Sequence, residues 1–289
     1  MKKLMAAMMA AVLSMSLLTA CGSAAEETAP AETATETTEE TTTAELTTEE
    51  EAAPAEEAAA ESSALADGVL NVGTNAEFPP FEYVNDNGEP DGFDIALIKA
   101  IGEKLGVEVQ VDNMEFASLI SSIGSKIDVS IAGMTVTDER KESVDFSNSY
   151  YNAVQYVILP EGSEIATADD LKGKAIGVQL GTTGDFIAEE IEDATTSQYN
   201  KAVDAVNDLA NGRLDCVIID KNPAMVFEAK FEGKVAAVDG AQFGFEPEDY
   251  AIAIPKGDTA LADQINTALQ ELIDDGTFDS LVSQYIEEN

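Results

Sequence analysis

The sequence predicts an α/β protein that consists of two similar lobes with a cleft between them. From residue 69 onward, short apolar runs rich in Val and Ile alternate with amphipathic helical patterns. This alternation occurs twice in a similar order, and each repeat is typical of an open α/β sheet. In such sheets ligands bind beyond the carboxyl ends of the strands, so we expect functional residues where the strands end.

The first repeat contains three expected strands and two expected helices. The helix after the first strand should end at Gly106, because glycine is common just past a helix C-terminus. We expect strands at 69–74 (VLNVGT), 107–113 (VEVQVDN) and 127–133 (IDVSIAG), and helices at 93–106 and 116–126.

The second repeat follows the same outline and leads into a last strand and two helices. We expect strands at 154–160 (VQYVILP), 174–180 (KAIGVQL), 214–220 (LDCVIID) and 250–257, and helices within 181–191, 202–212, 222–231, 259–275 and 277–287. The segments Tyr150–Ala153 and Glu246–Tyr250 lie at the two ends of this repeat. We expect the chain to cross between the lobes there.

The first 20 residues predict a secretory signal. Lys2 and Lys3 precede an apolar run from Leu4 to Leu18, and small residues follow, which is typical of a signal and not of a membrane span. The sequence LTAC at 18–21 resembles a bacterial lipobox, which implies that Cys21 is lipidated and holds the protein at a membrane face. The alternative is a plain signal followed by an incidental cysteine. We expect an extracytoplasmic protein.

Residues 21–66 are expected to be the lipidated cysteine and an extended, solvated tether. Residues 22–66 consist mostly of Ala, Thr, Glu, Ser and Pro, with 13 glutamates and no Lys, Arg or aromatic residue. Such a segment cannot bury a core, and its like charges repel one another.

Composition excludes several classes of function. The formal net charge of −41 disfavours nucleic acid as a partner and is expected to reflect a solvated surface. The chain has no histidine, which excludes Ser–His–Asp catalysis, and it has no metal-site spacing. With Cys21 assigned to the anchor, Cys216 has no disulfide partner and is expected to be a small core residue. We predict no metal ion and no cofactor.

Arg140 stands out in the stretch 131–146, IAGMTVTDERKESVDF. It is one of only two arginines, and it follows a predicted strand that ends in glycine. Its planar guanidinium suits a carboxylate, so one interpretation is an anion-binding residue. The other is a surface arginine that pairs with Glu139 or Glu142 on a short helix. Taken alone, Arg140 fits the second interpretation better.

Five segments in order resemble the amino-acid-binding proteins of ABC importers, the bacterial extracellular solute-binding proteins of family 3. They are VGTNAEFPPFEY, DGFDIALIKAIGEKLG, IAGMTVTDERKESVDFSNSYY, KGKAIGVQLGTTGDF and NGRLDCVIIDKNPA. The resemblance runs from about residue 67 to the end of the chain. It implies a two-lobed periplasmic-binding-protein fold of type II with two hinge crossings and a ligand cleft. Lobe 1 would comprise residues 67–150 and 252–289, and lobe 2 residues 151–251.

The resemblance implies two charged side chains that hold an amino acid. Arg140 matches the residue that binds the ligand's α-carboxylate, and Asp220 matches the acid that receives the α-ammonium group. Opposite charges on different lobes would bind a zwitterion and favour the closed state. For Asp220 the alternative is an N-cap of the helix that starts near Pro223, and the residues alone leave both roles open.

Four further residues are expected to contact the ligand's backbone groups. Gly133 and Thr135 match a backbone carbonyl and a hydroxyl that reach the ammonium and carboxylate groups. Gly181 and Thr182 lie at the start of a helix, where N–H groups favour a carboxylate, although an ordinary turn would also explain them.

Five residues are expected around the ligand's side chain. Phe78 and Phe116 match flanking aromatic residues, although each fits a core position as well. Asn75 stands where several relatives carry aspartate, and Gln179 stands where others carry lysine or another polar group. The amide at Asn75 weakens the case for a cationic ligand, although Glu77 could supply the missing charge. We therefore expect a polar amino acid, with a cationic one as the second choice.

These features predict a non-enzymatic, monomeric lipoprotein that captures an amino acid and delivers it to an ABC permease. One alternative is an enzyme on the same fold that resembles cyclohexadienyl dehydratases, which would need an acid or base beyond the charged pair. Another is a ligand-sensing receptor domain, although no signalling segment follows Asn289 in this sequence.

Overall fold

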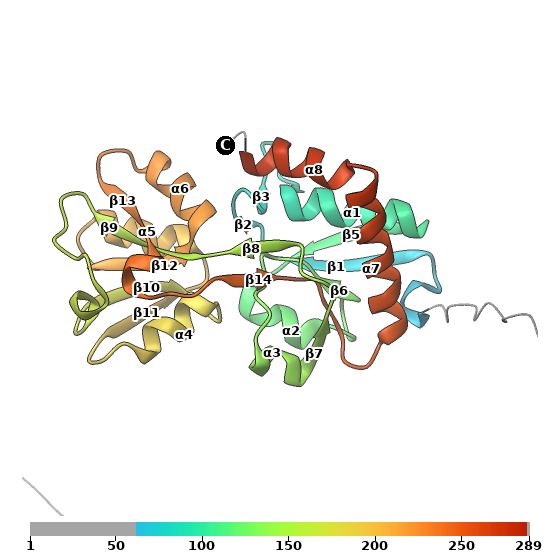
Figure 1. The fold of residues 1–289 in the computed structure, drawn as a ribbon, viewed down its shortest axis with the longest axis horizontal. Helices are drawn as coiled ribbons and strands as arrows, with labels where there is room; N and C mark the ends of the chain where they lie inside the picture. The colour runs from blue at the N-terminus through green and yellow to red at the C-terminus, as the bar shows by residue number, and fades with distance from the viewer. Residues whose placement is uncertain (1–61, 288–289) are drawn as a thin grey trace, which may run out of the picture. The chain divides into compact units, whose positions relative to one another are not determined.

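Two β-sheets flanked by helices form two lobes in the computed structural model (Figure 1). The structure describes residues 62–287. The predicted signal, the predicted lipidation site at Cys21 and most of the predicted tether lie outside the described residues. Among the helices of residues 62–287, none has the length and apolar character needed to cross a membrane.

Lobe 1 contains a five-stranded sheet with the order β5-β1-β6-β15-β7. Its strands are β1 (Val69–Thr74), β5 (Glu108–Asn113), β6 (Val129–Ser130), β7 (Val144–Phe146) and β15 (Ala253–Pro255). β1 is parallel to β5 and β6, whereas β15 is antiparallel to β6 and β7. A strand from near the end of the chain therefore completes the first sheet.

The helices of lobe 1 come from both ends of the folded part. They are α1 (Phe93–Leu105), α2 (Leu119–Ser122), α3 (Asp138–Ser143), α7 (Thr259–Asp274) and α8 (Thr277–Val282), with single turns η1 (Ser63–Leu65), η2 (Phe116–Ser118) and η5 (Ser283–Glu287). α1 ends where Gly106 adopts a left-handed φ of 71°, as predicted. α7 and α8 pack against α1 (Figure 1), so the C-terminal segment belongs to lobe 1.

A small three-stranded sheet lies between α1 and the cleft side of lobe 1. It contains β2 (Glu77–Phe78), β3 (Glu82–Val84) and β4 (Pro90–Asp91). β2 and β3 are antiparallel, with Phe78 opposite Glu82. This hairpin carries the FPPFEY segment toward the cleft.

Lobe 2 repeats the architecture with the sheet order β11-β10-β12-β9-β13. Its strands are β9 (Gln155–Pro160), β10 (Ala175–Gln179), β11 (Thr195–Tyr199), β12 (Cys216–Asp220) and β13 (Val235–Asp239). Its helices are α4 (Thr183–Glu190), α5 (Ala202–Ala210) and α6 (Lys221–Lys230), with turns η3 (Ala168–Leu171) and η4 (Gly240–Phe243). Cys216 is fully buried in this lobe, as predicted, and burial raises the pKa of its thiol to about 12.

Two strands connect the lobes side by side. β8 (Tyr151–Ala153) and β14 (Glu248–Tyr250) form an antiparallel pair within the segments where the sequence predicts crossings. Figure 1 shows this pair between the two sheets. Two adjacent crossings of this kind are the geometry of a hinge between rigid lobes.

Some predicted elements are clearly shorter in the structure, and the strands β2, β3, β4, β7, β11 and β13 are not predicted from the sequence. The helix at 116–126 is limited to η2 and α2, and Gly124 beyond it has a left-handed φ of 75°. The strand at 127–133 ends at Ser130, and the chain turns at Gly133 with φ 51°. β11 and β13 lie at the sheet edges, and the sequence TTSQY of β11 has no apolar run that would indicate a strand.

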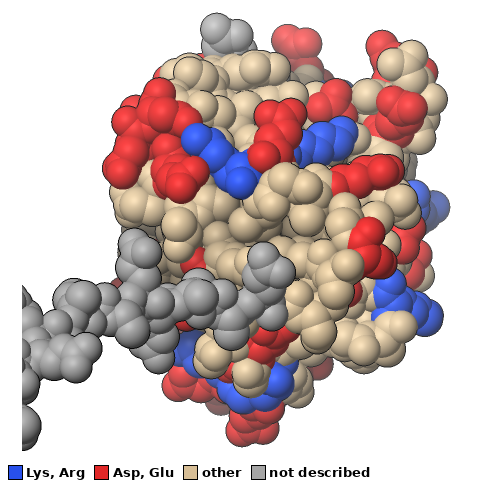
Figure 2. Space-filling model, turned by 90° about the vertical axis from the view of Figure 1, so that its right-hand side faces the viewer, with Lys and Arg blue, Asp and Glu red and all other residues tan. Residues whose placement is uncertain are grey.

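Acidic side chains are spread over the face of the molecule drawn in Figure 2, with basic side chains between them. This face includes lobe 1, whose helices bury their apolar stripes against the sheet: Leu97, Ile98 and Ile101 of α1 are inaccessible to solvent. The negative charges seen there therefore lie on a solvated surface.

Candidate ligand-binding site

A pocket lies where the two lobes face each other. Its wall consists of Asn75, Phe78, Glu82, Phe116, Ala132, Gly133, Thr135 and Arg140 from lobe 1, and Gln179, Thr182, Thr183 and Asp220 from lobe 2. Nine of the eleven ligand-binding residues predicted from the sequence are in this wall, and Glu77 and Gly181 are not. In the described part of the chain, no group of three or more His, Cys, Asp or Glu side chains is arranged to hold a metal ion.

Arg140 is buried in this wall although it lies on a short helix near the surface. Only 5% of it is exposed, whereas Glu139 and Glu142 on the same helix are exposed. No ion pair of the described residues involves Arg140. The interpretation as a surface arginine paired with a helix neighbour is therefore wrong.

Two backbone carbonyls and an aromatic ring hold the Arg140 guanidinium. Nη1 donates to Thr135 O at 2.6 Å, Nη2 donates to Gly181 O at 3.0 Å, and the Phe116 ring centroid lies 5.5 Å from Cζ. Burial lowers the pKa of Arg140, while the charges of nearby carboxylates oppose this shift. A guanidinium has more N–H donors than these two carbonyls use, so a carboxylate in the pocket can bind the others.

Asp220 lies at the end of β12, in the wall contributed by lobe 2. It occupies the N-cap position of α6, but its side chain makes no capping hydrogen bond. It is 8% exposed, and its Oδ1 has no hydrogen-bond partner among the described residues. Burial, with a smaller contribution from the charge of Glu248, raises the pKa of Asp220 to about 7. The side chain thus lines the pocket, takes part in no ion pair of the described residues and does not cap the helix.

A hydrogen-bond network around Glu248 was not predicted from the sequence. Glu248 Oε2 accepts hydrogen bonds from Thr135 Oγ1 at 2.6 Å, Thr183 Oγ1 at 2.8 Å and Gln155 Nε2 at 3.4 Å. Thr135 belongs to lobe 1, Thr183 and Gln155 belong to lobe 2, and Glu248 lies on the hinge strand β14. The Thr135 hydroxyl donates to Glu248 here, so it must rotate before it can donate to a ligand carboxylate.

Phe78 and Gly133 meet closely on the lobe 1 side of the pocket. A Cβ atom at Gly133 would lie 3.0 Å from a ring carbon of Phe78, and the φ of Gly133 is left-handed. The N–H of Gly133 donates to Asp94 Oδ2 at 2.8 Å. Glycine is required at this position both by its backbone conformation and by the aromatic ring against it. Phe78 lines the pocket and also packs into the core.

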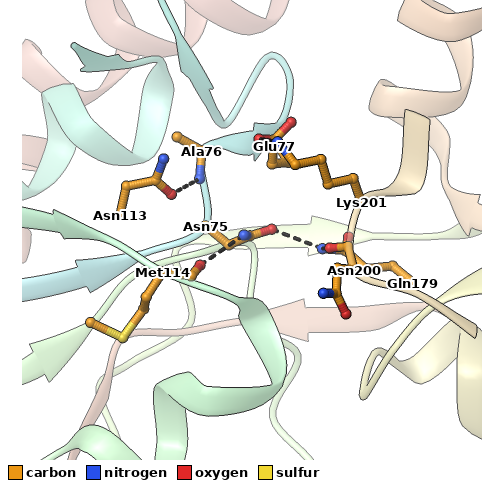
Figure 3. Close-up of polar contacts among 8 residues, drawn as sticks. All are labelled: Asn75, Ala76, Glu77, Asn113, Met114, Gln179, Asn200 and Lys201. Atoms are coloured by element: carbon orange, nitrogen blue, oxygen red, sulfur yellow. Dashed lines mark hydrogen bonds and ion pairs between the residues drawn. The ribbon is translucent and has the colours of Figure 1, made fainter. Parts of the chain in front are cut away.

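Two polar contacts join the lobes beside the pocket, and we call them the interlobe bridge (Figure 3). Gln179 Nε2 donates to Asn75 Oδ1 at 2.8 Å, and Lys201 forms an ion pair with Glu77. The orientation of the Asn75 amide is fixed because its Nδ2 donates to Met114 O at 2.8 Å. The structure therefore uses Glu77 and both polar groups of Asn75 for contacts within the protein.

The loop with Gly181 and Thr182 satisfies its own backbone groups. Gly181 N–H donates to Asp185 Oδ2 at 2.9 Å, and Thr182 N–H donates to Gln179 O at 3.3 Å. The Thr182 hydroxyl accepts from Asp185 N–H and caps α4. Thr182 still lines the pocket, whereas Gly181 contributes its carbonyl to Arg140.

Glu82 is the main pocket residue that the sequence analysis missed. It is inaccessible to solvent, it lines the pocket, and neither carboxyl oxygen has a hydrogen-bond partner among the described residues. A signal for it was present, since it is the single charged residue within the aromatic FPPFEY segment. Its pairing with Phe78 could not be inferred without the hairpin.

Comparisons with known proteins show the family of this chain. Residues 70–288 match the bacterial extracellular solute-binding proteins, family 3. The arginine-binding extracellular protein ArtP of Bacillus subtilis is 37% identical over 227 residues, which cover 75% of this chain and 85% of ArtP.

Solved structures are similar over nearly their whole length. An ancestral arginine-binding protein, solved with arginine and with glutamine, is 40% identical, with TM-scores of 0.72 and 0.69; the match covers 76% of this chain and 98% of that chain. The ancestral protein AncCDT-1, a precursor of cyclohexadienyl dehydratase, is 34% identical with a TM-score of 0.70 and covers 77% of this chain and 97% of its own. The two-lobed, type II periplasmic-binding fold predicted from the sequence is confirmed.

Proposed function

Because the chain belongs to family 3 of the bacterial extracellular solute-binding proteins, we propose that it captures a free amino acid in the interlobe pocket and delivers it to an ABC permease. The amino acid is held by its backbone groups, with the α-carboxylate on Arg140 and the α-ammonium group on Asp220. Gly133, Thr135 and Thr182 complete the contacts to these groups.

One observation carries this proposal: a buried guanidinium and a buried carboxyl group, neither of them in an ion pair of the described residues, line one pocket from different lobes. Within the described residues, no carboxylate forms an ion pair with Arg140, and Asp220 Oδ1 has no hydrogen-bond partner. A buried charge without a partner is costly, and a zwitterion would supply both partners at once. Since each charge lies on a different lobe, the ligand also links the lobes and favours closure.

The side chain of the ligand is polar or cationic in this proposal. Phe78 and Phe116 provide apolar walls, and Asn75 and Gln179 provide amides. The ArtP protein is named for arginine, and the ancestral relative was solved with both arginine and glutamine. These names support a pocket that takes a long polar side chain.

We further propose that the protein is monomeric and works outside the cytoplasm, held at the cell membrane by lipid on Cys21. The family is extracellular, and the motif LTAC follows a signal-like run. A tether of this composition lets the lobes reach a permease without a fixed orientation.

Isothermal titration calorimetry with the charge-pair variants tests the proposal. Arg140→Ala or Asp220→Asn removes one member of the pair and should reduce affinity by roughly 2–5 kcal/mol. Arg140→Lys should also bind poorly, because an ammonium group cannot reproduce the planar fork. Arg213→Ala is the matched control, since Arg213 pairs with Asp208 and neither residue lines the pocket. Wild-type affinity in a folded Arg140→Ala or Asp220→Asn variant would remove that residue from the site.

A turnover assay belongs with the binding assay, because Glu82 adds a protonatable carboxyl to the pocket wall. We propose that the protein is not an enzyme, so amino acids and prephenate-like acids should be recovered unchanged by mass spectrometry. A protein-dependent product that is lost in Glu82→Gln would support the cyclohexadienyl dehydratase alternative.

A further inference from the structure

Glu248 joins the two lobes through hydroxyl groups that line the pocket. One of its oxygens, Oε2, accepts a hydrogen bond from Thr135 of lobe 1 at 2.6 Å and another from Thr183 of lobe 2 at 2.8 Å. Both threonines belong to the pocket wall, whereas Glu248 does not. Its carboxylate therefore lies outside the wall, at the place where the wall passes from one lobe to the other.

The carboxylate of Glu248 is held on the lobe 2 side, whereas Thr135 follows lobe 1. Gln155 Nε2, at the start of β9, donates to Glu248 Oε2 at 3.4 Å and to Thr183 Oγ1 at 3.1 Å. Thr135 instead forms a backbone bridge with Tyr250, the last residue of β14 before the chain enters lobe 1. When the lobes separate, the bond between Thr135 and Glu248 should therefore break, while the bonds of Glu248 to lobe 2 can persist.

Glu248 also brings a negative charge close to the group proposed to hold the ligand's carboxylate. Burial lowers the pKa of Arg140, and the charge of Glu248 opposes this shift more strongly than any other nearby charge. The two side chains form no ion pair in the described part of the chain, so Glu248 does not occupy the guanidinium. A carboxylate of the protein thus uses the Thr135 hydroxyl and lies near the positive charge that the ligand's carboxylate would use.

We propose that Glu248 is an internal substitute for the ligand's carboxylate: it holds the lobes together through Thr135 and Thr183 when no ligand is bound, and it gives up Thr135 when a ligand enters. This rests on the proposed function, in which Thr135 donates to the α-carboxylate. The Thr135 hydroxyl has one proton and donates to one of the two carboxylates at a time. Glu248 is thus a positioning residue that closes the empty protein and does not add to the affinity for the ligand.

Interlobe distances measured by double electron–electron resonance without ligand test the first half of this proposal. Spin labels at Lys99→Cys on α1 and Glu190→Cys on α4 report on the two lobes, since both positions are exposed. The full chain carries Cys21→Ser, and the buried Cys216 stays unlabelled. Glu248→Ala should lower the ratio of closed to open molecules roughly tenfold or more, because it removes hydrogen bonds to a charged group. Glu248→Gln should lie between Glu248→Ala and the wild type, since a neutral amide oxygen accepts weaker hydrogen bonds.

Calorimetry of the same variants with arginine and with glutamine tests the second half. The loaded protein does not use the bond between Thr135 and Glu248, so its loss should leave the affinity unchanged or raise it. A purely structural role of Glu248 would weaken binding instead. Asp249→Asn is the matched control, because the side chain of this neighbouring hinge acid accepts from Ser149 and Asn152 and does not line the pocket. It should change neither the distances nor the affinity.

Two results would overturn the proposal. Equal distance distributions in the wild type and in Glu248→Ala, whether open or closed, would show that Glu248 does not hold the lobes together. An affinity lower by about threefold or more in Glu248→Ala would show that its hydrogen bonds belong to the loaded state. If Glu248→Ala does not fold, Glu248→Gln is judged by the same two criteria. If the wild-type protein binds no amino acid, the proposed function itself fails, whereas the distances still decide whether Glu248 holds the lobes.

Discussion

The ion pair between Glu77 and Lys201 connects the lobes beside the pocket, so its removal should weaken ligand binding although neither residue lines the pocket. The perturbation we consider is Lys201→Met, which keeps the length of the side chain and removes its charge. When the lobes separate, Glu77 and Lys201 move apart, because they belong to different lobes. The pair therefore stabilises the closed state relative to the open one, and a ligand that bridges the lobes binds the closed state.

The expected loss of affinity in Lys201→Met follows from how exposed the two paired side chains are. The side chain of Lys201 is 48% exposed and that of Glu77 is 23% exposed, so water screens much of their attraction. Pairs of this kind contribute about 0.2–1 kcal/mol, which corresponds to an affinity lower by about 1.4- to 5-fold in Lys201→Met. The factor should shrink as salt concentration rises, because salt screens partly exposed charges.

Titration calorimetry with glutamine at low and high salt measures this factor. Lys104→Met is the matched control, since Lys104 pairs with Glu271 and Asp275 within lobe 1 and should not affect closure. The double variant Glu77→Gln with Lys201→Met should bind no more weakly than Lys201→Met alone, because the pair is already broken. An unchanged affinity for glutamine in Lys201→Met at low salt would refute the reasoning.

Three further outcomes are expected. Asp220 has a pKa of about 7 in the folded protein against a usual 3.8, so its contribution to stability is complete below pH 3.8 and is lost as the pH rises through 7. The melting temperature of the ligand-free protein should fall as the pH rises from 3.8 to 7, and it should fall less steeply in Asp220→Asn, which cannot ionise. The affinity for an amino acid should rise over the same pH interval, because the ionised Asp220 binds the α-ammonium group. Gly133→Ala should lower the free energy of unfolding by about 1–2 kcal/mol because of its left-handed backbone, and by more because the new methyl group would press against Phe78. Gly124→Ala is the control: its backbone is also left-handed but nothing lies near the new methyl group, so only the backbone penalty should apply. Urea unfolding of both variants measures the difference. Cys21→Ser should release the protein from membranes, and a variant that stays bound after a high-salt wash would contradict the lipid anchor.

The sequence predicts the two lobes and the hinge well because those features depend on local patterns. Apolar strands, amphipathic helices and Gly106 are visible in short windows, and the crossing segments lie where the repeats end. Edge strands are harder to predict. The side chains of β11 are mostly polar, and the strand is stabilised by backbone hydrogen bonds to the neighbouring strand β10.

The pocket residues could be predicted where a motif marks them, but their contacts could not. The sequence leaves Arg140 open between a surface and a ligand-binding role, and only the fold shows that it is buried away from its helix neighbours. Likewise, the roles of Glu77 and Asn75 depend on which residues of lobe 2 face them. That information comes from the meeting of segments about 100 residues apart.

The polar ligand expected from the sequence rests on Asn75, where an amide replaces the aspartate of several relatives. In the structure both polar groups of Asn75 are engaged, one by Gln179 and one by Met114 O, so this amide is part of the interlobe bridge. Its lack of charge is consequently a weak guide to the charge of the ligand. The choice between a polar and a cationic ligand therefore does not follow from Asn75, and binding measurements with neutral and cationic amino acids are needed to make it.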